Sequence, residues 1–338
     1  ITLATHTHSG PGAYARNSAT EWAALGSFSP AVEEALATAA RTALTQALAA
    51  LAPAHLETGH ATTEGVTIAR TGAAADTRFT RLLFAGEEGP VAQLLIVSAH
   101  PTLVEKNPPA LSGDWPALLA ADLEKDGAVT LVLQGAAGNA SVNRAQLPTP
   151  EAVATKLAAL TRGLAMRPVG PDIDAAWSEL HVSLPHPDAS RVAPAFARTI
   201  VENALCDDAE DIAVVQVLRL ADEKLLFVPG EPSYEAGRVL EEQARATRLV
   251  SLADGYVGYI ETLEAANTGT GEAPRQYFPP SLITVLAEGA LPMTQMDIAV
   301  LDQRIADAQD DEIAAKTDAD RQKAAQLVDD LRLVKAAF

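Results

Sequence analysis

Residues 91–101 read VAQLLIVSAHP, an almost unbroken apolar run that ends in a histidine and a proline. A run so rich in aliphatic and β-branched residues predicts a strand that is buried on both faces. After it, residues 114–124 predict a helix, and residues 129–133 predict a second buried strand that leads into the glycine-containing stretch 134–141. A strand, a helix and a strand in succession are typical of an α/β fold.

The same alternation extends outward along the chain. A helix with a loose apolar stripe is predicted to begin at Pro30, because Ser29 suits the cap position and proline the first turn. Residues 212–220 and 225–228 predict an antiparallel hairpin. The further predicted elements are strands at 1–5, 66–70 and 250–252, helices at 29–51 and 150–165, and a helix that ends near residue 246. We therefore expect an α/β fold with a mixed β-sheet core flanked by helices.

One large domain is predicted over residues 1–295, with a loop between two subregions at 168–174. Residues 296–338 are charged and rich in alanine, and they predict a C-terminal segment of exposed helices. The chain begins at Ile1, without methionine and inside a predicted strand, so we expect that preceding residues are missing or have been removed.

The composition argues against several classes of function. Of the 338 residues, 25 are Lys or Arg and 44 are Asp or Glu, so the formal net charge is −19. Such a charge repels nucleic-acid phosphates and disfavours docking on anionic lipid. No run of 18 apolar residues is present, so no transmembrane helix is predicted. The single cysteine, Cys206, allows no intrachain disulfide. It follows a predicted helical stretch at 192–205, and we expect a structural thiol there.

Polar side chains of the kinds used in metal and acid–base chemistry follow several of the predicted strands. His6 and His8 are two residues apart, so on an extended segment both side chains point to one face. They are either one metal ligand plus one proton-transfer group or a hydrogen-bonded structural pair. His100 directly follows the buried strand, Glu231 lies in a Pro-Gly-Glu-Pro turn, and Ser141 follows a glycine-rich strand exit. Each of these three also has a structural interpretation, the last two as helix caps.

The motifs of several other enzyme classes are absent from the sequence. It contains no H-E-x-x-H, G-x-S-x-G or P-loop motif, and no complete G-x-G-x-x-G after a strand. A serine hydrolase of the nucleophile-elbow type is therefore disfavoured. The polar residues lie just past the carboxyl ends of predicted strands, which is where α/β proteins place their ligand sites.

The stretch 5–12, THTHSGPG, resembles the signature of the neutral/alkaline, non-lysosomal ceramidase family. Other landmarks of this family follow in the same order, up to about residue 285. They are IAR at 68–70, SAHPT at 98–102, SGD at 112–114, QGAAGNASVN at 134–143, PGEP at 229–232 and GYI at 258–260. Within the fourth of these, Asn139 stands where the family has aspartate, and Val142 where it has proline.

The resemblance implies a set of site residues. One zinc ion per chain would be bound by His6, His100, Glu231 and Tyr259. His8 would be the nearby proton-transfer group, Ser141 the active-site serine, and Arg70 a group that positions the substrate. Further candidates for substrate binding are Asp114, Tyr256 and Tyr277. Zinc is commonly held by nitrogen and carboxylate ligands, and it lowers the pKa of a bound water toward about 7 while it polarises a carbonyl.

The activity implied by the resemblance is that of a zinc-dependent amidohydrolase. It would use a metal-activated water to cleave the linear amide bond of an N-acyl sphingolipid such as ceramide, or of a related compound, in a secreted or cell-envelope location. Its partner would be a small-molecule or lipid substrate and not a nucleic acid, and the sequence sets no oligomeric state. Two alternatives stay open: a zinc hydrolase of the same fold that acts on a more polar amide or ester, and a non-catalytic binding protein that keeps the fold.

Two departures from the family bear on the substrate. The family's C-terminal immunoglobulin-like domain is not recognisable in the last fifty or so residues, and its second active-site tyrosine would fall at Gly271. We expect the small residues around Gly271 to open the pocket, which favours a bulkier or more polar headgroup. An aromatic content of only 4% points in the same direction.

Overall fold

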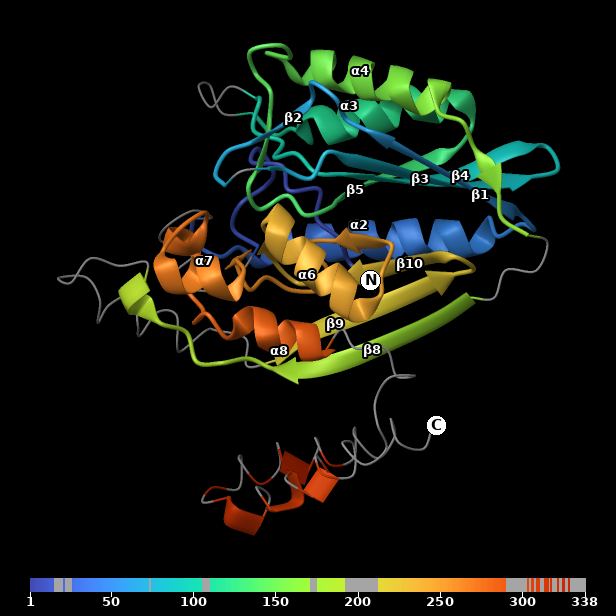
Figure 1. Ribbon diagram of the computed structural model, residues 1–338. Coiled ribbons are helices and arrows are strands. Elements are labelled where there is room, and N and C mark those ends of the chain that lie inside the picture. The colour runs from blue at the N-terminus through green and yellow to red at the C-terminus, as the bar shows by residue number, and fades with distance from the viewer. Residues whose placement is uncertain are drawn as a thin grey trace. The chain divides into compact units, whose positions relative to one another are not determined.

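Figure 1 shows the protein as a computed structural model. The structure describes residues 1–14, 21, 26–72, 74–104, 110–170, 175–191 and 212–289, together with scattered positions between 303 and 328. The chain divides into two compact units, Ile1–Ala290 and Leu291–Phe338. The first unit contains both of the larger sheets and every predicted site residue. The helix predicted at 192–205, Cys206 and most of the segment 296–338 lie outside the described residues, and the predicted boundary at residue 295 stays a prediction.

The first unit is built of four layers, with two β-sheets between two pairs of helices (Figure 1). Helices α3 (Asp114–Leu123) and α4 (Pro150–Gly163) cover the outer face of a five-stranded sheet. Helices α6 (Tyr234–Ala244) and α8 (Leu282–Gly289) cover the outer face of a four-stranded sheet. The predicted mixed α/β fold flanked by helices is confirmed, with two stacked sheets at its centre.

The five-stranded sheet has the order β5-β4-β3-β1-β7. The two predicted buried strands are β4 (Gly89–Val97) and β5 (Val129–Gln134), which pair in parallel with α3 in the connection between them. The antiparallel strands β3 (Arg78–Gly86) and β1 (His55–Thr62) continue the sheet, and the two-residue strand β7 (Arg167–Pro168) forms its edge. The sequence did not predict β1 and β3, because arginine, histidine and threonine interrupt their apolar pattern.

The four-stranded sheet has the order β12-β10-β9-β8. The predicted hairpin is confirmed as β9 (Ile212–Leu220) and β10 (Glu223–Phe227), and the predicted strand near residue 250 is β12 (Arg248–Val250). Strand β8 (Ala175–Ser183) pairs with β9 along its whole length and was not predicted. Of the predicted loop at 168–174, Pro168 belongs to β7, and residues 171–174 lie outside the described residues.

Two short ladders complete the β-structure. β2 (Thr67–Ala69) pairs antiparallel with β6 (Ala140–Val142), and β11 (Glu231–Pro232) pairs in parallel with β13 (Tyr259–Ile260). The remaining short elements are helix α7 (Leu263–Thr268) and the 3-10 turns Glu124–Asp126, Ala189–Arg191 and Ala273–Arg275. Both ladders bring together segments that lie far apart in the sequence and that contain predicted site residues.

Three clusters of buried apolar side chains lie between the four layers. The first, under α3 and α4, includes Phe79, Leu95, Trp115, Leu119 and Leu157. The second, between the two sheets, includes Leu56, Leu82, Ile96, Leu225 and Phe227. The third, under α6 and α8, includes Val215, Leu226, Leu240, Leu249 and Leu286. Strand β4 contributes to the first two clusters, since Leu95 and Ile96 point to opposite faces of its sheet.

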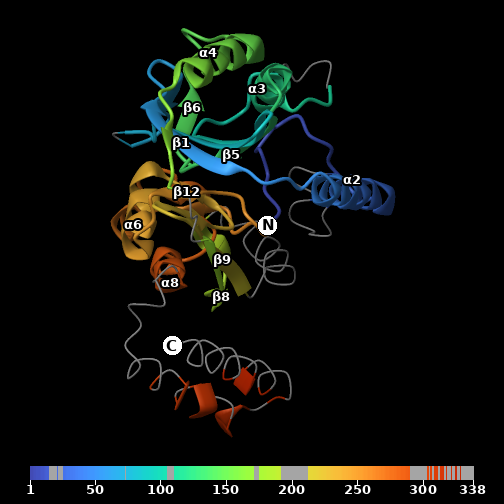
Figure 2. The same ribbon diagram turned by 90° about the vertical axis from the view of Figure 1, so that its right-hand side faces the viewer.

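Helix α2 (Pro30–Ala49) begins where the sequence predicts but does not pack in the core. None of its residues is buried, and Leu44 and Leu48 are 62% and 59% exposed. Figure 2 shows the helix lying beside the stacked layers. The predicted strand at 1–5 is reduced to a single bridge between Leu3 and Ala253. None of the helices in the described part of the chain has the length and apolar character that crossing a membrane requires.

Candidate metal centre

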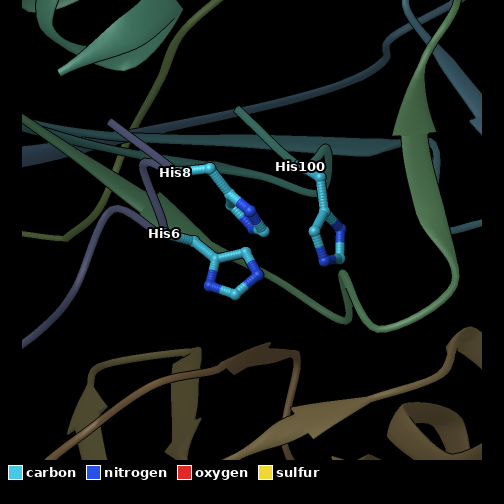
Figure 3. Close-up of side chains that lie close together, drawn as sticks. All are labelled: His6, His8 and His100. Atoms are coloured by element: carbon cyan, nitrogen blue, oxygen red, sulfur yellow. The ribbon is translucent and has the colours of Figure 1, made fainter. Parts of the chain in front are cut away.

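Three histidine side chains converge at one edge of the five-stranded sheet. His6 and His8 come from the N-terminal loop and His100 from the segment after β4, and the three rings face one another (Figure 3). One ring nitrogen of each lies within 4.8 Å of one ring nitrogen of each of the others. The ring centroids of His6 and His100 are 4.4 Å apart. Such a group of nitrogen ligands can hold a metal ion.

The rings of His6 and His8 lie close together, but the backbone that carries them is not the extended segment that the sequence predicted. His6 has a φ of 69°, in the left-handed region, so the segment is not an extended strand at this point. The rings of His6 and His8 are 5.1 Å apart in an edge-on arrangement. A non-glycine residue is uncommon in this backbone region and is held there at functional sites more often than elsewhere.

His100 is fixed by the strand exit that contains Ser141. Its backbone N–H donates to the carbonyl of Ala140 at 3.2 Å, and it forms a parallel bridge with Ser141. Its Nδ1 lies 2.8 Å from the same carbonyl oxygen of Ala140, which can only accept, so Nδ1 carries the proton. This contact orients the buried ring and turns Nε2 toward Oε2 of Glu231, where a metal ion would replace any proton on Nε2.

Glu231 supplies a buried carboxylate to the same point. Its Oε2 lies 3.1 Å from Nε2 of His6 and 3.1 Å from Nε2 of His100. Burial opposes ionisation, but the imidazoles of His100 and His6 prevail and hold the pKa of the Glu231 carboxyl well below its usual value. Three of the four predicted metal ligands therefore meet, although they come from segments near residues 6, 100 and 231.

The buried Nε2 atom of His6 indicates that these side chains fit a metal ion. Among the described residues it has no hydrogen-bond partner, even though Oε2 of Glu231 is 3.1 Å away. A buried nitrogen without a partner is costly, and an ion placed between the two atoms would satisfy it. Two imidazoles and a carboxylate are ligands that Zn²⁺ accepts, so the donor set fits the predicted metal.

Tyr259, the fourth predicted ligand, is the direct strand neighbour of Glu231. The two residues are paired in the parallel β11–β13 ladder, which places their side chains on the same face. Burial and the charge of Glu231 raise the pKa of the Tyr259 phenol to about 12, against the opposing effect of Arg70. Arg70 donates from Nη2 to the Tyr259 hydroxyl at 3.2 Å. Coordination by Tyr259 stays a prediction.

A glycine allows the two halves of the site to approach closely. A Cβ added at Gly138 would lie 2.5 Å from the backbone oxygen of Glu231. The Gly138 N–H donates to the Pro232 carbonyl at 2.9 Å. This contact brings the strand exit that orients His100 against the strand that carries Glu231. Ser141 lies on that exit, half-buried and paired with Ile68, and its catalytic role stays a prediction.

The three predicted substrate-binding residues have different surroundings. Asp114 is buried, and its Oδ2 accepts from the backbone N–H groups of Leu103 and Val104 at 2.7 and 3.1 Å, so it holds the loop that follows His100. Tyr256 donates from its hydroxyl to Oε1 of Glu231 at 2.5 Å. Tyr277 in turn donates to the carbonyl of Tyr256 at 3.2 Å. Contact of any of the three with a substrate stays a prediction.

Gly271 does not lie in an open loop, contrary to the expectation from sequence. Its φ is 63°, and a Cβ added there would lie 2.4 Å from Oε1 of Glu261. Glu261 is buried and accepts hydrogen bonds from the Ser233 hydroxyl and the Glu272 N–H, both at 2.7 Å. The backbone conformation and this carboxylate explain the glycine, so the inference of a widened pocket loses its basis.

Two polar residues of the site, Glu272 and Asn139, were given no role from the sequence, although Asn139 was noted as a departure from the family. Glu272 is fully buried and pairs with Arg70. Asn139 donates from Nδ2 to the carbonyls of Thr71 and Ala74 at 2.9 and 2.8 Å, and its Oδ1 accepts from the N–H of Tyr234 at 3.0 Å. An aspartate at 139 could not donate those two bonds. The sequence gives no signal for either role, because the partners are remote along the chain.

A buried ion-pair network lies behind the metal centre. Asp76 pairs with Arg248 and Arg78, and its Oδ2 accepts from the hydroxyl of Ser98, two residues before His100, at 2.9 Å. Arg78 also pairs with Glu241 on α6 at 2.8 Å. The network connects β3 of the five-stranded sheet with β12 of the four-stranded sheet and with α6. It therefore links the end of β4, which leads to His100, to the four-stranded sheet and its helix.

Comparison with known proteins gives two solved ceramidase structures. The chain is similar to neutral ceramidase from Pseudomonas aeruginosa, with a TM-score of 0.70 and 17% identity over 86% of this chain and 60% of that one. It is similar also to a ceramidase complexed with C2, with a TM-score of 0.70 and 16% identity over 89% of this chain and 61% of that one. No protein-family model and no curated protein matches the sequence. The resemblance predicted from short motifs is thus confirmed in three dimensions, and the chain has the neutral ceramidase fold.

Proposed function

We propose that the protein is a zinc-dependent hydrolase of the neutral ceramidase type, which cleaves the amide bond of an N-acyl sphingolipid or a related N-acyl compound. One observation carries the proposal: Nε2 of His6, Nε2 of His100 and Oε2 of Glu231 converge, with both nitrogens 3.1 Å from the oxygen. The fold shared with solved ceramidases supports the choice of an amide substrate.

Bound zinc would supply a Lewis acid and a water with a pKa lowered toward about 7. His6, His100 and Glu231 would hold it, with Tyr259 as the fourth ligand. The chain's own groups would then complete the reaction. His8, which is exposed and whose ring lies 5.1 Å from that of His6, would pass a proton to the leaving amine.

Arg70 would act on the acyl carbonyl. Its side chain is 29% exposed at the surface of the site, and its Nη2 atom contacts the Tyr259 hydroxyl at 3.2 Å. A fixed cationic donor of this kind stabilises the negative charge that develops on a carbonyl oxygen during acyl transfer. Ser141 is one strand position from the carbonyl that orients His100, from where its hydroxyl would contact the substrate.

The metal content of the purified protein tests the first half of the proposal. We expect about one zinc per chain and its loss in His100→Ala. The matched control is His181→Ala, which removes an exposed histidine of the second sheet whose Nε2 lies 2.8 Å from Oε1 of Glu179. Zinc that is absent from the wild-type protein, or retained in full by His100→Ala, would refute the metal site.

The substrate is tested under identical zinc loading with long-chain ceramide, short N-acyl amino acids and activated esters. We expect ceramide to be cleaved with a higher kcat/KM than the polar amides. The low aromatic content and the net charge of −19 favour the competing assignment to a polar amide or ester. The reverse order of kcat/KM would support that assignment, and a zinc-loaded protein without hydrolysis of any of them would indicate a binding protein.

A further inference from the structure

The guanidinium of Arg70 is held by three contacts. Its Nε donates to Oε1 of Glu272 at 3.0 Å, and its Nη2 donates to the carbonyl of Gly138 at 2.6 Å and to the hydroxyl of Tyr259 at 3.2 Å. The Cζ atom lies 5.7 Å from the centroid of the Tyr259 ring. Glu272 is the only one of the three partners that is charged in its ordinary state, and 202 positions separate it from Arg70.

Glu272 itself is fixed more tightly than an ordinary ion-pair partner. Its side chain is 1% exposed. Oε1 accepts a second hydrogen bond, from the hydroxyl of Thr71 at 2.6 Å, and Oε2 pairs with Arg275. Its backbone N–H donates to Glu261 at 2.7 Å. Every feature of this environment limits the freedom of the carboxylate.

Stability alone does not account for a buried carboxylate at this position. Taking a charge out of water costs several kcal/mol, and a buried ion pair is often no more stable than apolar side chains of the same volume. What the pair does provide is a fixed direction for the guanidinium, since Nε is bound on one side and Nη2 on the other. A planar guanidinium whose Nε and Nη2 atoms are both hydrogen-bonded is held in one orientation.

We propose that Glu272 is a positioning residue: it holds Arg70 in the orientation from which Nη2 contacts Tyr259 and an acyl carbonyl. This inference rests on the proposed hydrolase function. The inference adds Glu272 to the proposed function. Glu272 directly follows Gly271, in a stretch where the sequence showed small residues and lacked the tyrosine of the family. Glu272 touches no reacting atom and acts through Arg70 alone.

Kinetics of four variants test the inference: Glu272→Ala, Glu272→Gln, Arg70→Ala and the double variant Glu272→Ala/Arg70→Ala. We expect Glu272→Ala to lower kcat on an N-acyl substrate by about 10²-fold, the size of effect that misplacing a catalytic group causes, with KM nearly unchanged. Glu272→Gln keeps an acceptor for Nε and should recover part of that loss. In the Arg70→Ala background, Glu272→Ala should cause no further loss.

Glu223→Ala is the matched control. Glu223 on β10 is also a buried carboxylate, but it binds His60 on β1 and Thr247, which directly precedes β12, so its removal should lower stability without lowering kcat. A loss of kcat in Glu272→Ala that persists in full in the Arg70→Ala background would overturn the inference. So would an unchanged kcat in Glu272→Ala measured below its unfolding temperature.

A second measurement does not depend on activity. The Arg70 Nε–H resonance, assigned by its disappearance in Arg70→Lys, should be slow to exchange with water in the wild-type protein and fast in Glu272→Ala. Equal exchange in both proteins would overturn the inference. A wild-type protein that hydrolyses none of the substrates would refute the proposed function instead, while the exchange rates still decide whether Glu272 holds Arg70.

Discussion

The phenol of Tyr256 donates a 2.5 Å hydrogen bond to Oε1 of Glu231, the carboxylate whose other oxygen faces both His6 and His100. Tyr256 is a candidate for substrate binding, and this contact shows that it also orients the carboxylate of Glu231, a proposed metal ligand. Burial, followed by the negative charge of Glu231, raises the pKa of the Tyr256 phenol well above its usual value. The phenol therefore stays protonated and keeps its role as a donor.

Tyr256→Phe should weaken zinc binding by about 10- to 100-fold, the usual effect of removing a hydrogen bond to a metal ligand. Competition with a chelator of known affinity measures it. The control is Tyr234→Phe: Tyr234 lies three positions after Glu231, Arg78 faces its ring at 5.8 Å, and the phenol that donates to Glu231 is that of Tyr256. Unchanged zinc affinity in Tyr256→Phe would show that Glu231 does not need the phenol.

Asp76→Ala should cost about 3–5 kcal/mol of unfolding free energy, because it removes the nearest carboxylate of the buried Arg248 and leaves only the more distant Glu241 at 4.0 Å among the described ion pairs. Urea denaturation at neutral pH measures the loss. The control is Glu87→Gln, at an exposed position in the turn between β3 and β4, where the change should stay within about 0.5 kcal/mol. A loss of similar size in both variants would show that the network adds no stability.

The same network predicts how stability depends on pH. Burial opposes ionisation of Asp76, but Arg248 and Arg78 prevail and lower its pKa. A carboxyl whose folded pKa lies below its unfolded value of about 3.9 contributes stability above that value and loses it as the pH falls through the folded pKa. Wild-type stability should therefore fall below about pH 4, and Asp76→Asn should remove part of that dependence. An identical pH profile in the variant would contradict the assignment.

Much of the fold could be predicted because its central strands are apolar. β4, β5 and the β9–β10 hairpin are rich in aliphatic residues, and they were found close to their true bounds. β1 and β8 were not, because β1 buries a threonine and a glycine beside its leucine and β8 is exposed at nearly every position. The pairing of β8 with β9 is a tertiary interaction that leaves no local pattern.

The candidate site, too, could be predicted from the sequence only in part. His6, His100 and Glu231 lie in short motifs that resemble those of the ceramidase family, so the resemblance could group them, and the structure brings their side chains together. Glu272 and Asn139 could not be assigned, because their importance lies in partners 202 and 95 positions away. The expectation about Gly271 was wrong for a similar reason: the buried carboxylate of Glu261, not the neighbouring sequence, decides what fits there.

Asn139→Asp tests whether the amide at this position is required by its hydrogen bonds. The change replaces the Nδ2 donor to Thr71 and Ala74 by an oxygen that faces two carbonyl oxygens. We expect a loss of about 1–3 kcal/mol of unfolding free energy, the cost of leaving buried polar groups without partners. Asn143→Asp, at a half-buried position on the same strand exit, is the control and should change the unfolding free energy far less. Wild-type stability in Asn139→Asp would show that the surrounding backbone adapts to an aspartate.

Gly271→Tyr is the variant that sequence comparison with ceramidases would suggest as a gain of function, and the structure predicts the opposite. At a φ of 63°, any L side chain is strained by about 1–2 kcal/mol, and its Cβ would press against Oε1 of the buried Glu261 at 2.4 Å. The control is Gly269→Ala, at a φ of 71° and with nothing within 4 Å of the added Cβ, so this variant has the backbone strain alone. We expect Gly271→Ala to lose more unfolding free energy than Gly269→Ala.

We expect Gly271→Tyr to lose hydrolysis as well. Displacing Glu261 also displaces Glu272, because the backbone N–H of Glu272 donates to Glu261. Faster hydrolysis of ceramide by a stably folded Gly271→Tyr protein would show that the loop has room for a phenol after all, and that the absent tyrosine limits the activity of this chain.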